Sequence, residues 1–207
     1  MSDLIDVSHE GDLWVVTLNR SDKANALTAD MLNQLADIAQ DARHAKAFIL
    51  TGRGKVFSAG ADLADVGAGL ATDPAWERLS ANIAQIDGLT VAALNGTVAG
   101  GAHGMVLACD LRIAVTHTKF FYPVMKIGVM PQPSDPIRMA KLIGPARTKM
   151  ILLAGQKIAA ETAQNWGLVD AITKPDALLQ TAKDWCGDVL GADHRNAPSI
   201  KAAIDRA

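Results

Sequence analysis

Apolar residues recur at two different spacings along this chain, and the two spacings predict different elements. Residues 7–18 favour a β-hairpin with the sequence Glu10-Gly11-Asp12 at its turn. Residues 27–42 have apolar side chains at helical spacing, and Thr28 is placed to cap that helix. The same reasoning predicts strands at 48–51, 90–94 and 111–115, and helices at 76–86, 160–166, 177–190 and 199–206. Strands that alternate with helices indicate an α/β layered domain with right-handed crossovers.

Composition narrows the class of protein without changing this picture. The 207 residues suit one domain with a sizeable core, and contents of 49% hydrophobic and 20% charged residues fit a globular protein. The formal net charge is −2 and no dense Lys/Arg block occurs, so we expect neither nucleic acid nor a membrane surface as a partner. The first residues carry acids where a secretory signal needs basic residues, which favours a cytoplasmic protein.

An uncharged run at residues 88–109 is long enough to raise the question of a membrane span. Five glycines, Asn95 and His103 interrupt the run, so a strand followed by a buried helix is the better interpretation. Cys109 and Cys186 lie far apart in the sequence, and we expect two reduced thiols. The histidines are scattered without the spacing of paired ligands, so no metal site is expected.

Two glycine-rich segments, residues 57–63 and 95–104, carry the clearest chemical signal. The second follows the apolar run 90–94 and indicates a buried strand, a tight turn and the start of a helix of small residues. Such a turn presents free backbone N–H groups at a helix N-terminus, where negative charge is favoured. N–H donors from two such turns would form an oxyanion hole for a thioester carbonyl that gains negative charge. The structural alternative is two turns that only permit tight packing of a strand against a helix.

These segments, taken as residues 57–63 and 95–110, resemble the two signature segments of the enoyl-CoA hydratase/isomerase (crotonase) superfamily. The resemblance continues, in order and spacing, through residues 19–27, 48–52, 126–131 and 153–169. It implies a crotonase-type α/β spiral of ββα units with stacked sheets and a shortened C-terminal helical region. It further implies a core domain over 1–175 and a helical segment over 176–207 that assists oligomerisation or covers the site.

The resemblance also implies a ligand and the residues that hold it. The ligand is an acyl-CoA thioester, with coenzyme A as part of the substrate and no separate cofactor, bound by a homotrimer or hexamer. The oxyanion hole falls on the backbone N–H groups of Ala61 and Gly101. The expected CoA contacts are Lys23, Ala24, Ala26, Ala59, Asp62 and Leu63. For Lys23, which would reach a phosphate, an ordinary surface lysine is an equally good interpretation.

The acid and base residues are where the chain departs from the superfamily. Hydratases of this superfamily use two glutamates to position and activate water. Their positions correspond here to Gly104 and Val124, and neither residue can move a proton. We therefore do not expect ordinary enoyl hydration with paired carboxylates.

Three nearby residues offer different chemistry. His103 suits proton transfer near neutral pH, or it packs and hydrogen-bonds beneath the glycine turn. Asp135 is placed to act as a base or nucleophile. Alternatively, Ser134 or Asp135 caps a helix that has Pro136 at its first position. Tyr122 donates a hydrogen bond to substrate or forms the pocket wall.

The sequence thus predicts an enzyme that binds an acyl-CoA thioester and polarises its carbonyl through Ala61 and Gly101. The resulting enolate would react with non-standard acid and base residues, among which His103 and Asp135 are the candidates. Two alternatives remain open. One is a non-catalytic acyl-CoA-binding protein, and the other is a hydrolase that cleaves a C–C bond in a β-dicarbonyl compound.

Overall fold

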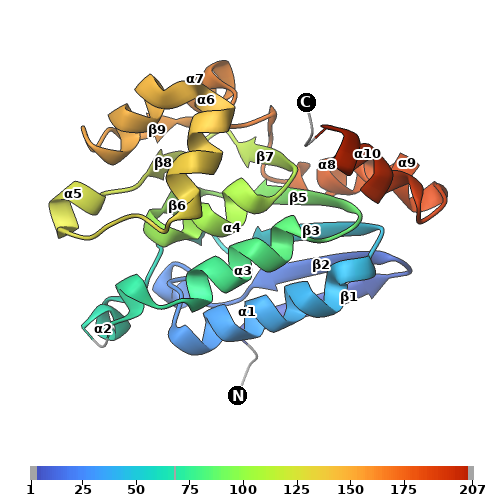
Figure 1. The fold of residues 1–207 in the computed structure, drawn as a ribbon, viewed down its shortest axis with the longest axis horizontal. Coiled ribbons are helices and arrows are strands. Elements are labelled where there is room, and N and C mark those ends of the chain that lie inside the picture. The colour runs from blue at the N-terminus through green and yellow to red at the C-terminus, as the bar shows by residue number, and fades with distance from the viewer. Residues whose placement is uncertain (1–3, 68, 205–207) are drawn as a thin grey trace.

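The computed structural model describes residues 4–67 and 69–204, and it shows two sheets enclosed by helices (Figure 1). The larger sheet has six strands in the order β1-β2-β3-β5-β7-β10. Only β1 and β2 pair antiparallel, and the other neighbours in this sheet are parallel. The strands are β1 (Ile5–Glu10), β2 (Leu13–Leu18), β3 (Ala47–Gly52), β5 (Leu89–Leu94), β7 (Leu111–Val115) and β10 (Ala171–Thr173).

A smaller sheet of four short strands extends the larger one. Its order is β4-β6-β8-β9, with β4 (Val56–Ser58), β6 (Thr97–Ala99), β8 (Lys119–Phe121) and β9 (Ile158–Ala159). The chain passes from β3 to β4, from β5 to β6 and from β7 to β8, so each turn of the spiral adds one strand to each sheet. This arrangement confirms the predicted α/β fold class with stacked sheets.

The helices cover both faces of the larger sheet. One face packs against α1 (Ala29–Asp41), α3 (Ala75–Ala84), α4 (His103–Ala108) and α6 (Ser134–Leu152), and the other packs against α8 (Leu178–Trp185). The remaining helices are α2 (Leu63–Val66), α5 (Val124–Ile127), α7 (Ala160–Trp166), α9 (Gly187–Gly191) and α10 (Asn196–Ile204). Short 3₁₀ turns occupy Ser21–Lys23, Ala42–His44, Leu70–Thr72 and Gly100–Ala102.

Alternation along the central strands explains why both faces need cover. In β3, Phe48 and Leu50 belong to the core beneath α1 and α3, whereas Ala47 and Ile49 belong to the core beneath α8. Successive side chains of a strand point to opposite faces, so a strand buried on both sides is a continuous apolar run.

Most of the predicted longer elements are confirmed. The hairpin is present, and the Thr28 hydroxyl accepts a hydrogen bond from the Met31 N–H at 3.2 Å, which caps α1. The helix predicted over 177–190 is instead two helices, α8 and α9, that meet at Cys186. The last predicted segment, 199–206, is helical as far as Ile204, and its final two positions lie outside the described residues.

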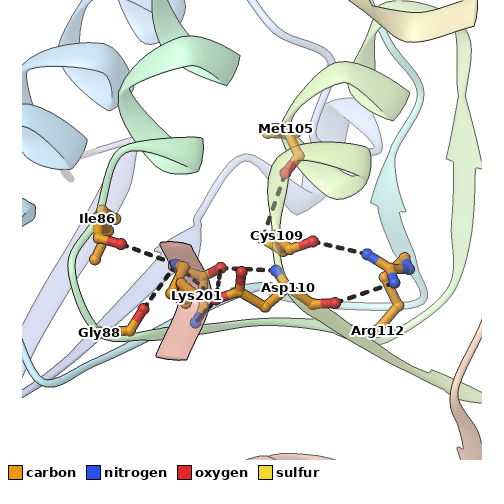
Figure 2. Close-up of polar contacts among 8 residues, drawn as sticks. Ile86, Gly88, Met105, Cys109, Asp110, Arg112 and Lys201 are labelled. Carbon is orange, nitrogen blue, oxygen red and sulfur yellow. Dashed lines mark hydrogen bonds and ion pairs between the residues drawn. The ribbon is translucent and has the colours of Figure 1, made fainter. Parts of the chain in front are cut away.

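Lysine side chains hold the C-terminal helices to the rest of the chain. The Lys46 ammonium donates to the carbonyls of Leu190 and Ala192, at 3.1 and 2.8 Å. Figure 2 shows the Lys201 ammonium of α10 beside Ile86, Gly88 and Asp110, with contacts of 2.9 to 3.0 Å. These helices lie at the opposite end of the molecule from α2 and α5 (Figure 1).

Of the helices that the structure describes, none is long and apolar enough to cross a membrane.

Candidate functional site

The two glycine-rich turns predicted from the sequence meet in space. Gly60 and Gly100 both have positive φ, at +87° and +54°. A Cβ atom added to Gly60 would lie 2.7 Å from the Ala99 carbonyl oxygen, so only glycine permits this approach. The contact brings Ala61, which follows one turn, and Gly101, in the other, to the wall of a single cavity.

The backbone N–H groups of Ala61 and Gly101 are not used by the secondary structure around them. A parallel bridge joins Leu27 to Ala61, with the Leu27 N–H donating to Gly60 and the Asp62 N–H donating to Leu27. In such a bridge the central residue, Ala61, directs its own N–H to the opposite side. Gly101 lies in the first turn of the 3₁₀ segment that leads into α4, where N–H groups have no intrahelical acceptor.

The cavity between these turns has a volume of about 190 Å³ and mostly apolar walls. Among its described lining residues there is no carboxylate, and the polar side chains are Trp76, Tyr122 and Gln132. The Trp76 indole N–H donates to the Leu70 carbonyl at 2.7 Å, and the Gln132 amide donates to Ala71 at 2.9 Å. The apolar lining residues include Leu63 and Val66 of α2, Val124 and Ile127 of α5, Phe121, Val129 and Met130.

The two positions that the resemblance aligns with catalytic glutamates have different surroundings. Val124 lines the cavity and is buried. Gly104 is also buried, and a Cβ atom placed on it would lie 3.0 Å from Oδ1 of Asp135. The Asp135 carboxyl group therefore fills the space that a side chain at position 104 would enter.

His103 is buried beneath the second glycine turn, and it does not line the cavity. Its Nδ1 lies 2.9 Å from the Gly100 carbonyl oxygen, which can only accept, so Nδ1 carries the proton. Its Nε2 is buried and has no partner among the described residues. Burial lowers the pKa of His103 to about 4, so the ring is neutral at pH 7. The geometry favours the interpretation of a histidine hydrogen-bonded beneath the turn.

The hydrogen bond from His103 fixes the orientation of the peptide group between Gly100 and Gly101. The Gly100 carbonyl and the Gly101 N–H belong to one peptide unit, which is trans. In a planar trans peptide the two groups point in opposite directions. Since His103 holds the carbonyl from below, it also sets the direction in which the Gly101 N–H points.

Asp135 lies in the first turn of α6 but does not cap it. The prediction that Ser134 or Asp135 is the N-cap is wrong, because α6 already begins at Ser134 and no side chain caps it. The Ser134 hydroxyl and N–H instead both donate to Glu77, at 3.0 Å each. Asp135 points inward and is completely buried. Its Oδ2 accepts a hydrogen bond from the Tyr122 hydroxyl at 3.0 Å.

The Asp135 carboxyl group has an unusual electrostatic environment. Burial raises its pKa to about 7, and the hydrogen bond from Tyr122 only partly opposes that shift. Oδ1 is buried and without a hydrogen-bond partner in the described part of the chain. Asp135 does not line the cavity, so it lies behind the wall.

Tyr122 connects Asp135 to the cavity. It lines the cavity, and its ring stacks on the ring of His103, with centroids 5.2 Å apart and planes 12° apart. Burial, followed by the nearby charge of Asp135, raises the pKa of the Tyr122 hydroxyl above its usual value. The three residues named separately from the sequence thus form one cluster of stacked and hydrogen-bonded side chains.

The residues expected to contact CoA also lie together, beside the cavity. The Ala59 N–H donates to the Ala24 carbonyl at 2.9 Å, and the loop 23–26 therefore runs alongside residues 59–63. Buried Asn25 holds this loop, with its amide donating to the carbonyls of Arg53 and Val56. Lys23 is exposed, Leu63 is 87% exposed, and Ala24 and Ala26 are half-buried.

Asp62 has partners of its own within the chain. Its carboxylate accepts from Arg20 at 2.5 Å and caps α2 through the Ala64 N–H at 2.9 Å. The hydrogen bond from Arg20 is the main reason that the pKa of Asp62 is lowered. Asp62 thus contributes mainly to the conformation of this loop.

Some contributing residues were missed at the level of sequence. Trp76 lies under Gly101, where an added Cβ would be 3.0 Å from the indole ring, so this tryptophan supports the second turn. The only signal was its place at the start of the predicted helix 76–86.

Among the described residues, no group of three His, Cys, Asp or Glu could hold a metal ion.

Comparison with known proteins gives a consistent assignment. A family model described as enoyl-CoA hydratase/isomerase matches residues 8–207. The putative enoyl-CoA hydratase/isomerase YngF of Bacillus subtilis is 36% identical, over 93% of this chain and 77% of the relative. The short-chain-enoyl-CoA hydratase of Clostridium acetobutylicum is 31% identical, over 95% and 79%. The solved structure of Pseudomonas aeruginosa DspI superposes with a TM-score of 0.92 at 26% identity, over 100% of this chain and 88% of that one. The chain therefore belongs to the enoyl-CoA hydratase/isomerase (crotonase) superfamily.

Proposed function

We propose that this protein is an enzyme that binds an acyl-CoA thioester and stabilises the enolate formed from it. The observation that carries the proposal is the meeting of two glycine turns, which brings Ala61 and Gly101 to the wall of one apolar cavity. The thioester oxygen accepts both hydrogen bonds, and its negative charge grows as the enolate forms. Removing one such donor costs about 3 to 4 kcal/mol of transition-state stabilisation in enzymes that use them.

His103 contributes to this site by orientation. It is neutral and carries its proton on Nδ1, so it donates to the Gly100 carbonyl throughout the neutral pH range. The bond keeps the Gly101 N–H directed away from His103 before the substrate arrives. A donor that is already oriented needs no reorganisation when charge develops.

The CoA portion of the ligand lies, in this proposal, along the loop 23–26 and residues 59–63. Backbone groups of Ala24, Ala26 and Ala59 contact the pantetheine and adenine parts. The ammonium group of Lys23, exposed at the end of its 3₁₀ turn, pairs with a phosphate. Leu63 covers the acyl side from the short helix α2.

The reaction is a proton transfer at the thioester, of the lyase or isomerase type, and not ordinary hydration. Water addition in this superfamily relies on two glutamates, and this cavity has no carboxylate among its described lining residues. The same observation favours one alternative, a non-catalytic protein that senses acyl-CoA. Both functions predict that acyl-CoA binds, but only the enzyme predicts that it is converted to a product.

Calorimetric titration tests the proposal directly. We expect acetoacetyl-CoA, whose enolate resembles the proposed intermediate, to bind at least tenfold more tightly than free CoA. Equal affinities would exclude recognition of the thioester carbonyl, and a lack of binding by both ligands would exclude the CoA assignment. Crotonyl-CoA added to the same sample should be hydrated slowly or not at all. Light scattering during gel filtration tests the proposed homotrimer or hexamer.

A further inference from the structure

Tyr122 is the only ionisable side chain among the described residues that line the cavity. Its hydroxyl has two neighbours within hydrogen-bonding distance, the Asp135 carboxylate at 3.0 Å and the Gln132 N–H at 3.4 Å. The hydroxyl donates to Asp135 and accepts from the Gln132 N–H, which leaves one lone pair to accept a proton or a hydrogen bond from a ligand. A ligand in the cavity thus meets Tyr122, and it meets Asp135 only through Tyr122.

The Asp135 carboxyl group is buried in a way that is costly for a structural residue. It has no ion pair within 4.0 Å among the described residues, and one of its oxygens has no hydrogen-bond partner. Burial is the main cause of its raised pKa; Glu77 on α3 raises the pKa further and Arg138 on α6 lowers it, while Gly104 approaches from α4. Neutral His103, also on α4, stacks on the Tyr122 ring. A buried carboxylate without a cation costs several kcal/mol, which is avoided when the group takes up a proton.

We propose that Tyr122 is the catalytic residue that exchanges a proton with the α-carbon of the bound thioester, and that Asp135 is the positioning residue that receives the tyrosine's own proton. This inference rests on the proposed function, because it requires a thioester carbonyl held by Ala61 and Gly101. It reassigns the role that the sequence suggested for Asp135, from a group that touches substrate to one that acts through Tyr122.

The transfer balances without any further reactant. The α-C–H bond breaks, and its electron pair moves into the enolate, whose oxygen is held by the two N–H groups. The proton forms a bond to Oη of Tyr122 while the proton already on Oη moves to Oδ2 of Asp135. The reverse step returns a proton to the α-carbon from Tyr122, which is reprotonated by Asp135. No free tyrosinate forms, which is necessary because burial disfavours that anion.

Gly104 and Asp135 are therefore two parts of one arrangement. A side chain at position 104 would enter the space occupied by Oδ1 of Asp135, since even a Cβ would lie 3.0 Å away. Glycine at this position removes one carboxylate and at the same time makes room for another. That second carboxylate, Asp135, lies behind Tyr122 and not on the cavity wall. In the proposed relay it takes part in the transfer of one proton, whereas two glutamates would position and activate water.

The exchange of α-protons with solvent tests this relay. Butyryl-CoA and hexanoyl-CoA are incubated with the protein in D₂O, and proton NMR follows the loss of the α-methylene signal. We expect wild-type exchange to rise with pH through neutrality, as Asp135 becomes able to accept a proton. Tyr122→Phe should reduce the rate at least about 100-fold, the usual scale for removing a general acid or base. Asp135→Asn should reduce it similarly and abolish the pH dependence.

Binding measurements on the same samples separate the relay from the proposed function. Tyr122→Phe, which keeps the ring and its contact with His103, should bind acetoacetyl-CoA within threefold of wild type. Lys126→Gln, at an exposed position on the nearby helix α5, is the matched control and should match wild type in both assays. Exchange by Tyr122→Phe within threefold of the wild-type rate would overturn the relay. Wild-type binding without exchange of either substrate would also overturn it, and failure of wild type to bind would overturn the proposed function as well.

Discussion

Two polar clusters in this protein, one partly exposed and one buried, differ in how completely they are paired. The Lys201 cluster comprises Lys201, Asp110, Arg112 and Thr90, of which the first three are labelled in Figure 2. One oxygen of Asp110 accepts from Lys201, from the Thr90 hydroxyl and from the Thr90 N–H, at 2.8 to 2.9 Å. Arg112 donates there to three backbone carbonyls and contacts Asp170. In the cluster of His103, Tyr122 and Asp135, by contrast, two acceptor atoms have no partner among the described residues.

The difference separates a structural role from a chemical one. The Lys201 cluster joins α10 to the start of β5, and in it the negative charge of Asp110 is paired with the positive charge of Lys201. An unpaired buried acceptor costs about 1 to 3 kcal/mol, so the second cluster lowers the stability of the fold. Its two unpaired members, His103 and Asp135, lie behind Tyr122, which is the only ionisable side chain on the described cavity wall. In the relay proposed above, the less completely paired cluster is the one in which a proton moves.

Asp135→Asn should produce the largest change, in the pH dependence of stability. The pKa of Asp135 is raised from 3.8 to about 7 by folding, so its protonated form stabilises the native state. That stabilisation is complete below about pH 4 and is lost as pH rises to 7. Relative to wild type, the variant should therefore gain up to about 4 kcal/mol between pH 4 and 7, and nothing more above pH 7. Urea unfolding at each pH measures the gain, and parallel curves for the two proteins would contradict it.

Lys201→Met should have the next largest effect, on stability alone. It removes three hydrogen bonds at a site that remains partly exposed, with Lys201 at 24% and Asp110 at 29%. We expect a loss of about 1 to 3 kcal/mol in the free energy of unfolding, with faster hydrogen exchange in α10. Lys149→Met, at an exposed position on α6, is the control and should change little. Weaker binding of acetoacetyl-CoA by Lys201→Met would show that the two clusters are not independent.

His103→Ala should weaken the oxyanion site by a smaller amount. Without the bond to Gly100, the Gly101 N–H is present but less firmly oriented, so we expect the preference for acetoacetyl-CoA over free CoA to fall about tenfold, or about 1.4 kcal/mol. Asparagine can donate from nearly the same place as Nδ1, so His103→Asn should restore most of the preference. If both variants behave alike, the histidine acts through packing and not through its hydrogen bond.

Glu77→Gln should give the smallest effect, a change that is confined to the pH dependence of α-proton exchange. Glu77 is the negative charge that raises the pKa of Asp135 across the interface between α3 and α6. Removing that charge should lower the pH at which α-proton exchange reaches half of its maximum, with little change in the maximal rate. An upward shift would contradict the proposed coupling between these carboxyl groups.

The sequence predicted those parts of the fold in which a repeating pattern is long enough to detect. The strands Ala47–Gly52 and Leu89–Leu94 were identified as continuous apolar runs, and the helix Ala29–Asp41 was identified from apolar residues at helical spacing. Stacked sheets were expected only from the resemblance, and the individual strands of the smaller sheet were not located, since strands of two or three residues contain no measurable period. Its existence follows from tertiary pairing, which local sequence does not encode.

The candidate site likewise has features that could be predicted from the sequence and features that could not. The two glycine turns were identified from sequence because close backbone approach demands glycine. The inward direction of Asp135 was not, because a serine and an aspartate just before a proline also favour a helix cap. Contact between Tyr122 and Asp135 depends on where α6 sits relative to β8. It therefore appears only in three dimensions.

The closeness of Gly104 and Asp135 also has an evolutionary consequence. Glutamate introduced at position 104 alone would be forced against a carboxyl group that is already there. Shortening Asp135 alone would leave a cavity and a tyrosine without its acceptor. Each single change thus passes through a less fit intermediate, whereas the two together need not. We therefore expect sign epistasis between positions 104 and 135, so that a laboratory evolution experiment toward glutamate at position 104 would need a double mutation.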